Sequence, residues 1–166
     1  SSVLLAALVV TPLFTGCAPV QDQLFDIGLA AERSMSGFNL KQIEVADHNW
    51  TYLDSLDGDS AEANTDKNKP VILMLHGFAV DKDNWLRYAR YLGDYRLVAP
   101  DLPGHGETSY NPDFTYDFAQ QALWLNEFIT ALDLKNVHLV GNSMGGGIAL
   151  MYSFNHPDNV ESITLI

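Results

Sequence analysis

An α/β fold is the fold class that the sequence predicts, with an antiparallel hairpin followed by a parallel, doubly wound sheet. Residues 71–75 (VILML) are apolar at every position and residues 137–140 (VHLV) nearly so, which is typical of strands that helices cover on both faces. Between these strands, one helical face gathers Phe118, Ala122, Leu125, Ile129 and Leu132 within the segment 115–132. Strands and helices that alternate in this way indicate parallel strands joined by helical crossovers.

A short helix and a β-hairpin are expected before the first buried strand. Residues 22–36 are weakly amphipathic and predict the helix. Residues 40–45 alternate with period two and residues 49–56 are rich in strand-forming side chains, so the turn falls at Asp47 and His48. The remaining expected elements are a polar loop at 57–69, a helix from Asp81 or Asp83 to Leu92, a strand at 95–99, a helix at 144–154 and a strand from 160 to 166.

Length and composition indicate one globular domain and exclude several functions. The chain has 166 residues, 47% of them hydrophobic, and a formal net charge of −12 with only nine lysines and arginines. An acidic surface of this kind repels phosphate backbones, so we expect no nucleic-acid partner. The single cysteine, Cys17, excludes an intramolecular disulfide and a cysteine-based zinc site.

The first twenty residues predict a segment for export. They carry no charge, and residues 3–10 are continuously apolar, too short for a bilayer crossing of about 20 residues but suited to a secretory signal. The small residues before Cys17 resemble the lipobox of bacterial lipoproteins, which implies lipidation of Cys17 and membrane attachment. The residue after the cysteine helps to decide the sorting of such lipoproteins, and Ala18 at this position resembles those sorted to the outer membrane. The alternative interpretations of this segment are a strand or helix of the core and an uncleaved membrane anchor.

A strand-turn-helix junction carries the strongest motif. Residues 141–145 (GNSMG) match G-x-S-x-G between a predicted strand and a predicted helix, which is the context of a nucleophile elbow. The turn is so tight that Gly141 and Gly145 must lack bulk, and it holds the Ser143 hydroxyl at the N-terminus of a helix. The alternative interpretation is a glycine-rich turn in which the serine only caps the helix.

Three motifs together resemble the α/β-hydrolase superfamily: residues 141–146 (GNSMGG), 76–78 (HGF) and 101–106 (DLPGHG). Residues 81–85 (DKDNW) narrow the resemblance to bacterial lipases and esterases of family V. It runs from about residue 38 to residue 166.

The stabilisation of an oxyanion follows from these motifs. A tetrahedral intermediate needs two N–H donors, of which the residue after the nucleophile, Met144, supplies one. The resemblance implies that the backbone of Phe78 supplies the other, that Gly77 lets the chain turn, and that His76 holds this loop by a hydrogen bond.

The other histidines and acids do not complete a triad in sequence order. In this fold the order is serine, acid, histidine, so Asp101 and His105 are interpreted as parts of a rigid loop. His156 and Asp158 follow a helix and are not expected as partners of the serine. The acid and the histidine are therefore expected beyond Ile166, and the natural N-terminus before Ser1. His48, His138 and the aromatic series Trp85, Tyr88 and Tyr91 are interpreted as structural.

The function that we expect is hydrolysis of a carboxylic ester. Ser143 attacks a small-molecule or lipid ester and forms an acyl-enzyme, with no metal or organic cofactor; the resemblance favours a lipase. The expected organisation is a partial signal peptide at 1–16, a tether and helix at 17–37, and the N-terminal part of a hydrolase domain at 38–166, exported by a Gram-negative bacterium and held on its outer membrane or secreted. A carbon–carbon bond hydrolase of the same fold and a non-catalytic surface lipoprotein are the alternatives.

Overall fold

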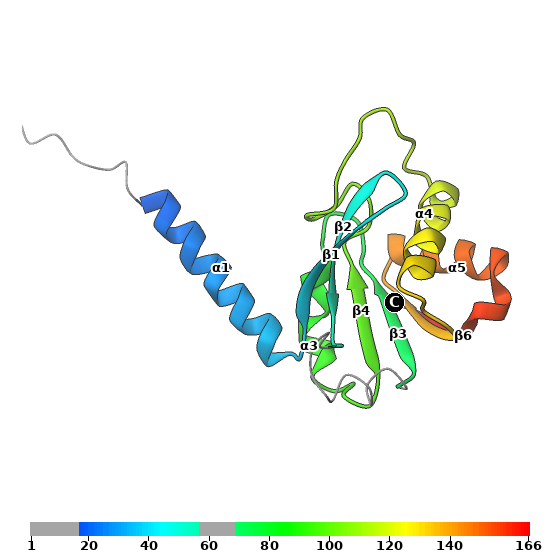
Figure 1. Ribbon diagram of the computed structural model, residues 1–166, viewed down its shortest axis with the longest axis horizontal. Helices are drawn as coiled ribbons and strands as arrows, with labels where there is room; N and C mark the ends of the chain where they lie inside the picture. Colours follow the sequence, from blue (N-terminus) through cyan, green and yellow to red (C-terminus); the bar gives the residue numbers. More distant parts are fainter. Residues whose placement is uncertain (1–16, 57–68) are drawn as a thin grey trace, which may run out of the picture. The chain divides into compact units, whose positions relative to one another are not determined.

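The computed structural model describes residues 17–56 and 69–166, with side chains from residue 20 onward (Figure 1). The expected signal peptide at 1–16 lies outside the described residues, as does most of the expected polar loop at 57–69. The chain divides into two units, residues 1–31 and residues 32–166. Helix α1 (Cys17–Met35) provides all the described residues of the first unit. Among the described residues, no helix is long and apolar enough to cross a membrane.

Strands and helices alternate through the second unit as the sequence predicts. In chain order the elements are β1 (Asn39–Val45), β2 (His48–Asp54), β3 (Val71–Leu75), the 3-10 helix η1 (Lys82–Trp85), α3 (Leu86–Ala89), β4 (Arg96–Pro100), α4 (Phe118–Ala131), β5 (Val137–Gly141), α5 (Met144–Asn155), the 3-10 helix η2 (Pro157–Asn159) and β6 (Val160–Leu165).

The strands form a mixed sheet, which has six strands among the described residues, in the order β1-β2-β4-β3-β5-β6. The β1–β2 and β2–β4 pairs are antiparallel, whereas β4, β3, β5 and β6 run parallel. The predicted hairpin and parallel sheet are thus confirmed. All five residues of β3 are buried because this strand lies between β4 and β5 with helices over both faces. By contrast β5, expected to be buried throughout, alternates between buried and half-buried positions.

The hairpin turn lies one residue earlier than predicted. Ala46 and Asp47 both have positive φ, 56° and 61°, the backbone form that suits the twist of a two-residue hairpin. His48 therefore opens β2 opposite Val45 and is buried. Its ring packs edge-on against Trp124, with centroids 4.5 Å apart.

The helix after β3 is much shorter than predicted. Asp81 accepts a hydrogen bond from the Asp83 N–H and caps η1, and α3 ends at Ala89 instead of reaching Leu92. Because this short segment turns only one side to the sheet, Trp85 is buried while Tyr88 is 56% exposed and Tyr91 is 87% exposed. The structural interpretation is right for Trp85. The Tyr88 ring contacts Trp85, with centroids 5.8 Å apart, but both tyrosines are largely exposed.

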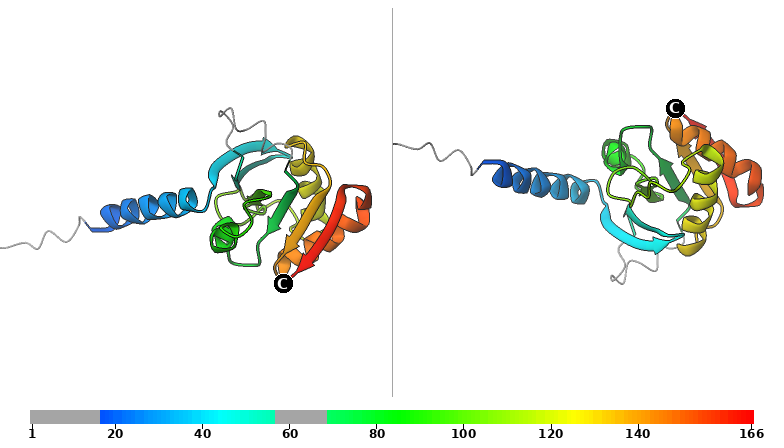
Figure 2. Two further views of the ribbon diagram at one scale, coloured as in Figure 1. Left: turned by 90° about the horizontal axis from the view of Figure 1, so that it is seen from below. Right: turned by 90° about the horizontal axis from the view of Figure 1, so that it is seen from above.

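Helices α4 and α5 pack together on the face of the sheet opposite α3 (Figure 2). Asp117 caps α4 by accepting the Gln120 N–H, so this helix begins later than predicted. Its buried face centres on Leu125 and Phe128, and the Phe128 ring stacks on Trp50 of β2 at 4.6 Å. Phe118, expected on that face, is 49% exposed. Each fully buried large apolar side chain contributes about 1.5–3 kcal/mol to this core.

Candidate active site

Ser143 has a backbone conformation that L-residues rarely adopt. It lies between β5 and α5 with φ 48° and ψ −109°. Its side chain makes no capping hydrogen bond, and the residue is exposed. A serine that only caps a helix would use its hydroxyl on the helix N–H groups, so this observation speaks against the capping interpretation. Strained residues of this kind gather at active sites.

The two glycines of the motif lie where no side chain fits. A Cβ on Gly145 would stand 2.3 Å from the Leu75 carbonyl oxygen, and one on Gly141 would stand 2.6 Å from the Gly146 nitrogen. Both contacts are with backbone, so the predicted requirement for small residues is confirmed. The atoms nearest to a Cβ on Gly147 belong to the Phe118 ring of α4.

Backbone hydrogen bonds fix the elbow between its neighbouring strands. The Asn142 N–H donates to the Leu75 carbonyl at 3.0 Å, and the Ser143 N–H donates to the Ile166 carbonyl at 2.9 Å. The elbow is therefore held at the carboxyl ends of β3 and β6, the sheet edge where α/β proteins gather their working groups.

Two backbone N–H groups remain without an acceptor beside this elbow. Among the described residues, the amides of Phe78 and Met144 donate no hydrogen bond. Met144 opens α5, and Phe78 lies in the loop after β3. A positioned pair of free N–H donors is what an oxyanion hole requires.

Gly77, expected to let the chain turn, also lies close to the elbow. A Cβ there would stand 2.6 Å from Oδ1 of Asn142. The glycine therefore allows the loop after β3 to approach the elbow closely.

His76 holds this loop as expected. It is fully buried; its Nε2 accepts the Leu102 N–H at 3.0 Å, and its Nδ1 lies 2.8 Å from the Gly77 carbonyl. Since Nε2 accepts, the proton is on Nδ1 and the ring is neutral. Burial lowers the pKa of His76, and the hydrogen bond to Gly77 opposes this only in part. With both nitrogens engaged, His76 has no free atom for a proton from Ser143.

A cavity of about 270 Å³ adjoins the two donor residues. It is lined by Phe78, Pro103, Gly104, His105, Tyr110, Tyr116, Gln121 and Met144. His105 thus lies at the cavity wall, whereas the sequence interpretation made it only a loop residue. A larger hollow of about 430 Å³ lies at the opposite ends of β3, β5 and β6, between Pro70 and Glu161. We place the site at the smaller cavity because the donors are there.

The remaining candidates make no hydrogen bond with Ser143 among the described residues. Asp101 is fully buried and accepts hydrogen bonds from Lys82 and from the Glu107 N–H. His156 follows the far end of α5 and packs on Tyr152, with ring centroids 4.9 Å apart. Among the described residues no side chain hydrogen-bonds the Ser143 hydroxyl.

Sequence reasoning missed Lys82. It lies in the charged run 81–83, which looks solvated, yet only 1% of the residue is exposed. The hydrophobic periodicity of the sequence does not indicate its burial, because its partners, Asp101 and Glu107, belong to another loop.

Comparisons with known proteins agree with this geometry. Residues 70–166 match the family described as alpha/beta hydrolase fold. A monoacylglycerol lipase of Xenopus laevis (abhd6-B) is 42% identical over 102 residues, 60% of this chain and 30% of that protein. Lipase 3 of Moraxella sp. (strain TA144) is 35% identical over 139 residues, 81% of this chain and 41% of the relative.

A solved structure is similar over most of the chain. The crystal structure of a membrane phospholipase A, described as a bacterial virulence factor, has a TM-score of 0.78 and 38% identity. The similarity covers 88% of this chain and 44% of that one. The chain thus spans less than half the length of each of these three proteins.

Proposed function

Because the chain belongs to the alpha/beta hydrolase fold family, we propose that it carries the nucleophile and the oxyanion hole of a serine ester hydrolase of the lipase type. The observation that carries this proposal is Ser143, exposed at φ 48° between β5 and α5. The free N–H groups of Phe78 and Met144 support it, as do the names of the two lipases to which the chain is similar.

The reaction would proceed through an acyl-enzyme. The Ser143 Oγ attacks the ester carbonyl carbon while its proton passes to a general base. The carbonyl oxygen becomes an oxyanion that accepts hydrogen bonds from the Phe78 and Met144 N–H groups. The C–O bond then breaks, the alcohol leaves with the proton, and water attacks the acyl-enzyme to release the acid. We place the base and its orienting acid outside the described residues, in the order usual for this fold.

The substrate would be a lipid ester or a small ester with an apolar acyl group. The cavity beside the donors has aromatic walls, with the Tyr110 and Tyr116 rings stacked 5.3 Å apart. Apolar walls of this kind suit an acyl chain. The second candidate, a carbon–carbon bond hydrolase, uses the same nucleophile and oxyanion geometry and differs in the bond that it breaks.

The test is Ser143→Ala in the full-length protein, assayed on a p-nitrophenyl ester series and on a vinylogous diketo acid. Loss of the nucleophile lowers turnover by several powers of ten. Ser153→Ala is the matched control, because Ser153 lies further along α5 and donates only to Leu150 of the same helix. Ester turnover by the Ser143→Ala protein close to wild type would overturn the proposal, and turnover of the diketo acid alone would favour the second candidate.

The export and anchoring of the protein remain part of the same proposal. Residues 1–16 would act as the signal, Cys17 would carry the lipid, and residues 38–166 would form the hydrolase part. A lipid-bearing terminus would place the enzyme beside lipid esters, since acyl chains contribute about 0.8 kcal/mol for each buried CH₂ group.

A further inference from the structure

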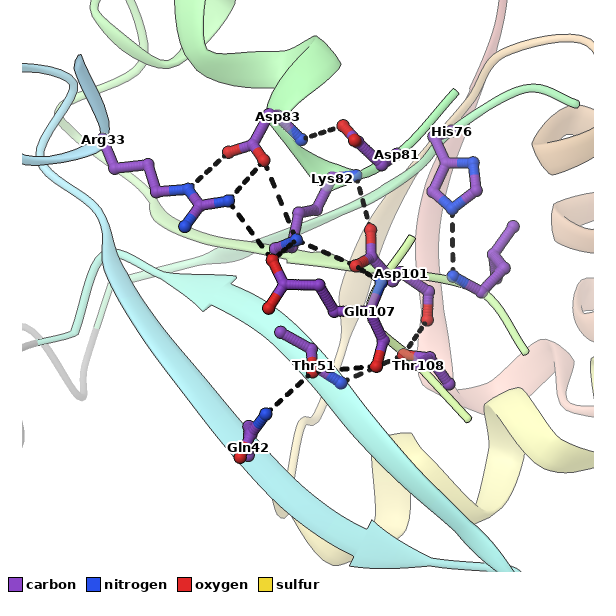
Figure 3. A network of polar contacts seen from close by, with 11 residues as sticks. Arg33, Gln42, Thr51, His76, Asp81, Lys82, Asp83, Asp101, Glu107 and Thr108 are labelled. Atoms are coloured by element: carbon purple, nitrogen blue, oxygen red, sulfur yellow. Dashed lines mark hydrogen bonds and ion pairs between the residues drawn. The ribbon is translucent and has the colours of Figure 1, made fainter. Parts of the chain in front are cut away.

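A buried ion pair lies next to the loop that carries Phe78. Lys82 Nζ contacts Asp101 Oδ2 at 2.8 Å and Glu107 Oε1 at 2.9 Å (Figure 3). The lysine is 1% exposed and Asp101 is fully buried. Burial alone would lower the pKa of Lys82, but its hydrogen bonds with Asp101 and Glu107 raise it overall, so the amine stays charged. Lysine is almost never this buried unless it is paired.

The same aspartate also holds the backbone. The Lys82 N–H donates to Asp101 Oδ1 at 2.8 Å, while the Glu107 N–H donates to Oδ2 at 2.8 Å. A Cβ on Gly106 would stand 2.2 Å from the Asp101 carboxylate, so the 101–107 loop closes tightly around it. One carboxylate therefore joins the chain after β3 to the loop after β4.

Each end of the loop 77–81 is attached to the loop after β4, and the two attachment points there, Leu102 and Asp101, are consecutive residues. At its start, His76 accepts the Leu102 N–H; at its end, Lys82 is held by Asp101. Between these two attachments lies Phe78, whose N–H is free and whose side chain is 76% exposed. Its ring packs edge-on against His105 of the 101–107 loop, with centroids 5.7 Å apart, so the direction of the Phe78 N–H depends on how these two loops are held together.

From this arrangement we propose that Lys82 and Asp101 are positioning residues, which hold the loop 77–81 so that the Phe78 N–H points at the oxyanion. This inference rests on the proposed function. A buried ion pair adds little stability over an apolar pair of the same size. The effect of the pair on the placement of the Phe78 N–H is separate from its effect on stability. The first is measured by kcat and inhibitor binding, the second by Tm.

The network continues outward to the last turn of α1. Arg33 Nε donates to Asp83 Oδ1 at 2.6 Å, and Asp83 Oδ2 lies 3.7 Å from Lys82 Nζ. Arg33 contacts Asp83 and Glu107, so it is one step further from the loop 77–81 than Lys82 is. We therefore expect Arg33→Met to lower kcat less than removal of the Lys82 charge.

The experiment uses the full-length protein and a variant without buried charge. Lys82→Met alone leaves Asp101 ionised and unpaired, so Lys82→Met/Asp101→Asn is made as well. Lys135→Met is the control, because its pair with Asp133 has the same 2.8–2.9 Å contact but its side chains are 68% and 85% exposed. Four quantities are measured: kcat, KM, the inhibition constant of a trifluoromethyl ketone whose hemiketal oxyanion fills the hole, and Tm.

The side chain created by Asp101→Asn has one acceptor oxygen, so the double variant keeps only one of the two backbone hydrogen bonds and is expected to fold with a lower Tm. It should lose about 10- to 100-fold in kcat with KM within about twofold, and bind the trifluoromethyl ketone correspondingly less tightly. A kcat and an inhibitor affinity within twofold of wild type would show that the pair is only structural and would overturn the inference.

A measurement without substrate separates this inference from the proposed function. If wild type shows no turnover that depends on Ser143, the proposed function fails. Hydrogen exchange of the Leu102 amide, which donates to His76, then decides the inference. We expect at least tenfold faster exchange in the double variant than in Lys135→Met, and equal rates would refute a loop held by Lys82 and Asp101.

Discussion

Gly145→Ala tests whether the close contact of α5 with β3 sets the geometry of the site. The new Cβ would stand 2.3 Å from the Leu75 carbonyl oxygen and 2.6 Å from that of His76. An ordinary contact begins at 3.4 Å, so the start of α5 must move away from the end of β3 by about 1 Å. That movement separates Ser143 and the Met144 N–H from the loop that carries the Phe78 N–H.

The expected magnitudes follow from this displacement. A misplacement of about 1 Å costs about 10²-fold in rate. Overpacking costs about 1–3 kcal/mol, and alanine in a helix gives back about 1 kcal/mol relative to glycine. The net loss of about 0–2 kcal/mol corresponds to a fall in Tm of at most about 8 °C for a domain of this size.

Gly147→Ala is the matched control two residues along the same helix. Its Cβ would stand 3.0 Å from the Phe118 ring, which is 49% exposed and can move aside. We expect it to keep the wild-type kcat and to change stability by less than about 1 kcal/mol. Both proteins are compared by kcat on a p-nitrophenyl ester and by thermal unfolding. A Gly145→Ala protein with a kcat within threefold of the control would refute the reasoning.

Three further predictions concern the oxyanion loop, the buried histidines and the N-terminus. Gly77→Val should clash with Asn142, tilt the Phe78 N–H and lower kcat by about 10²–10³ with little change in Tm; less than a tenfold loss in a folded protein would argue against this donor. Burial lowers the pKa of His48, so the unfolded chain takes up a proton first as the pH falls below about 6.5. The free energy of unfolding should therefore decrease from that pH downward and less steeply in His48→Phe, as urea titrations at several pH values would show; identical pH profiles would contradict this. In a Gram-negative host that expresses the complete gene, mass spectrometry should find acyl chains on Cys17, and an unmodified thiol would count against anchoring.

The features that the sequence predicts correctly are those that local chemistry decides. The run 71–75 is a buried strand in the structure because five apolar residues in succession suit only a strand covered on both faces. The elbow is where the motif places it because the glycines at 141 and 145 are required by contacts of the turn itself and of the adjacent strand.

The features that it misses depend on partners far away in the chain. The burial of Lys82 has no local signal in the sequence. Its ion-pair partners, Asp101 and Glu107, lie 19 and 25 residues further on. Gly77 looks like a turn residue, and its close approach to the Asn142 side chain, on another strand end, has no local signal. The helix after β3 is short because only one turn of it packs against the sheet. Local helix propensity does not predict where that packing ends.

The backbone of Ser143 places thermodynamic stability and reactivity in opposition at one position. A non-glycine residue at φ 48° and ψ −109° costs of order 1–3 kcal/mol, which the surrounding fold must offset. Glycine would relieve that strain and would also remove the hydroxyl. Libraries selected for thermal resistance alone should therefore enrich changes at this residue, and directed evolution of a more durable enzyme needs a screen for turnover at every round.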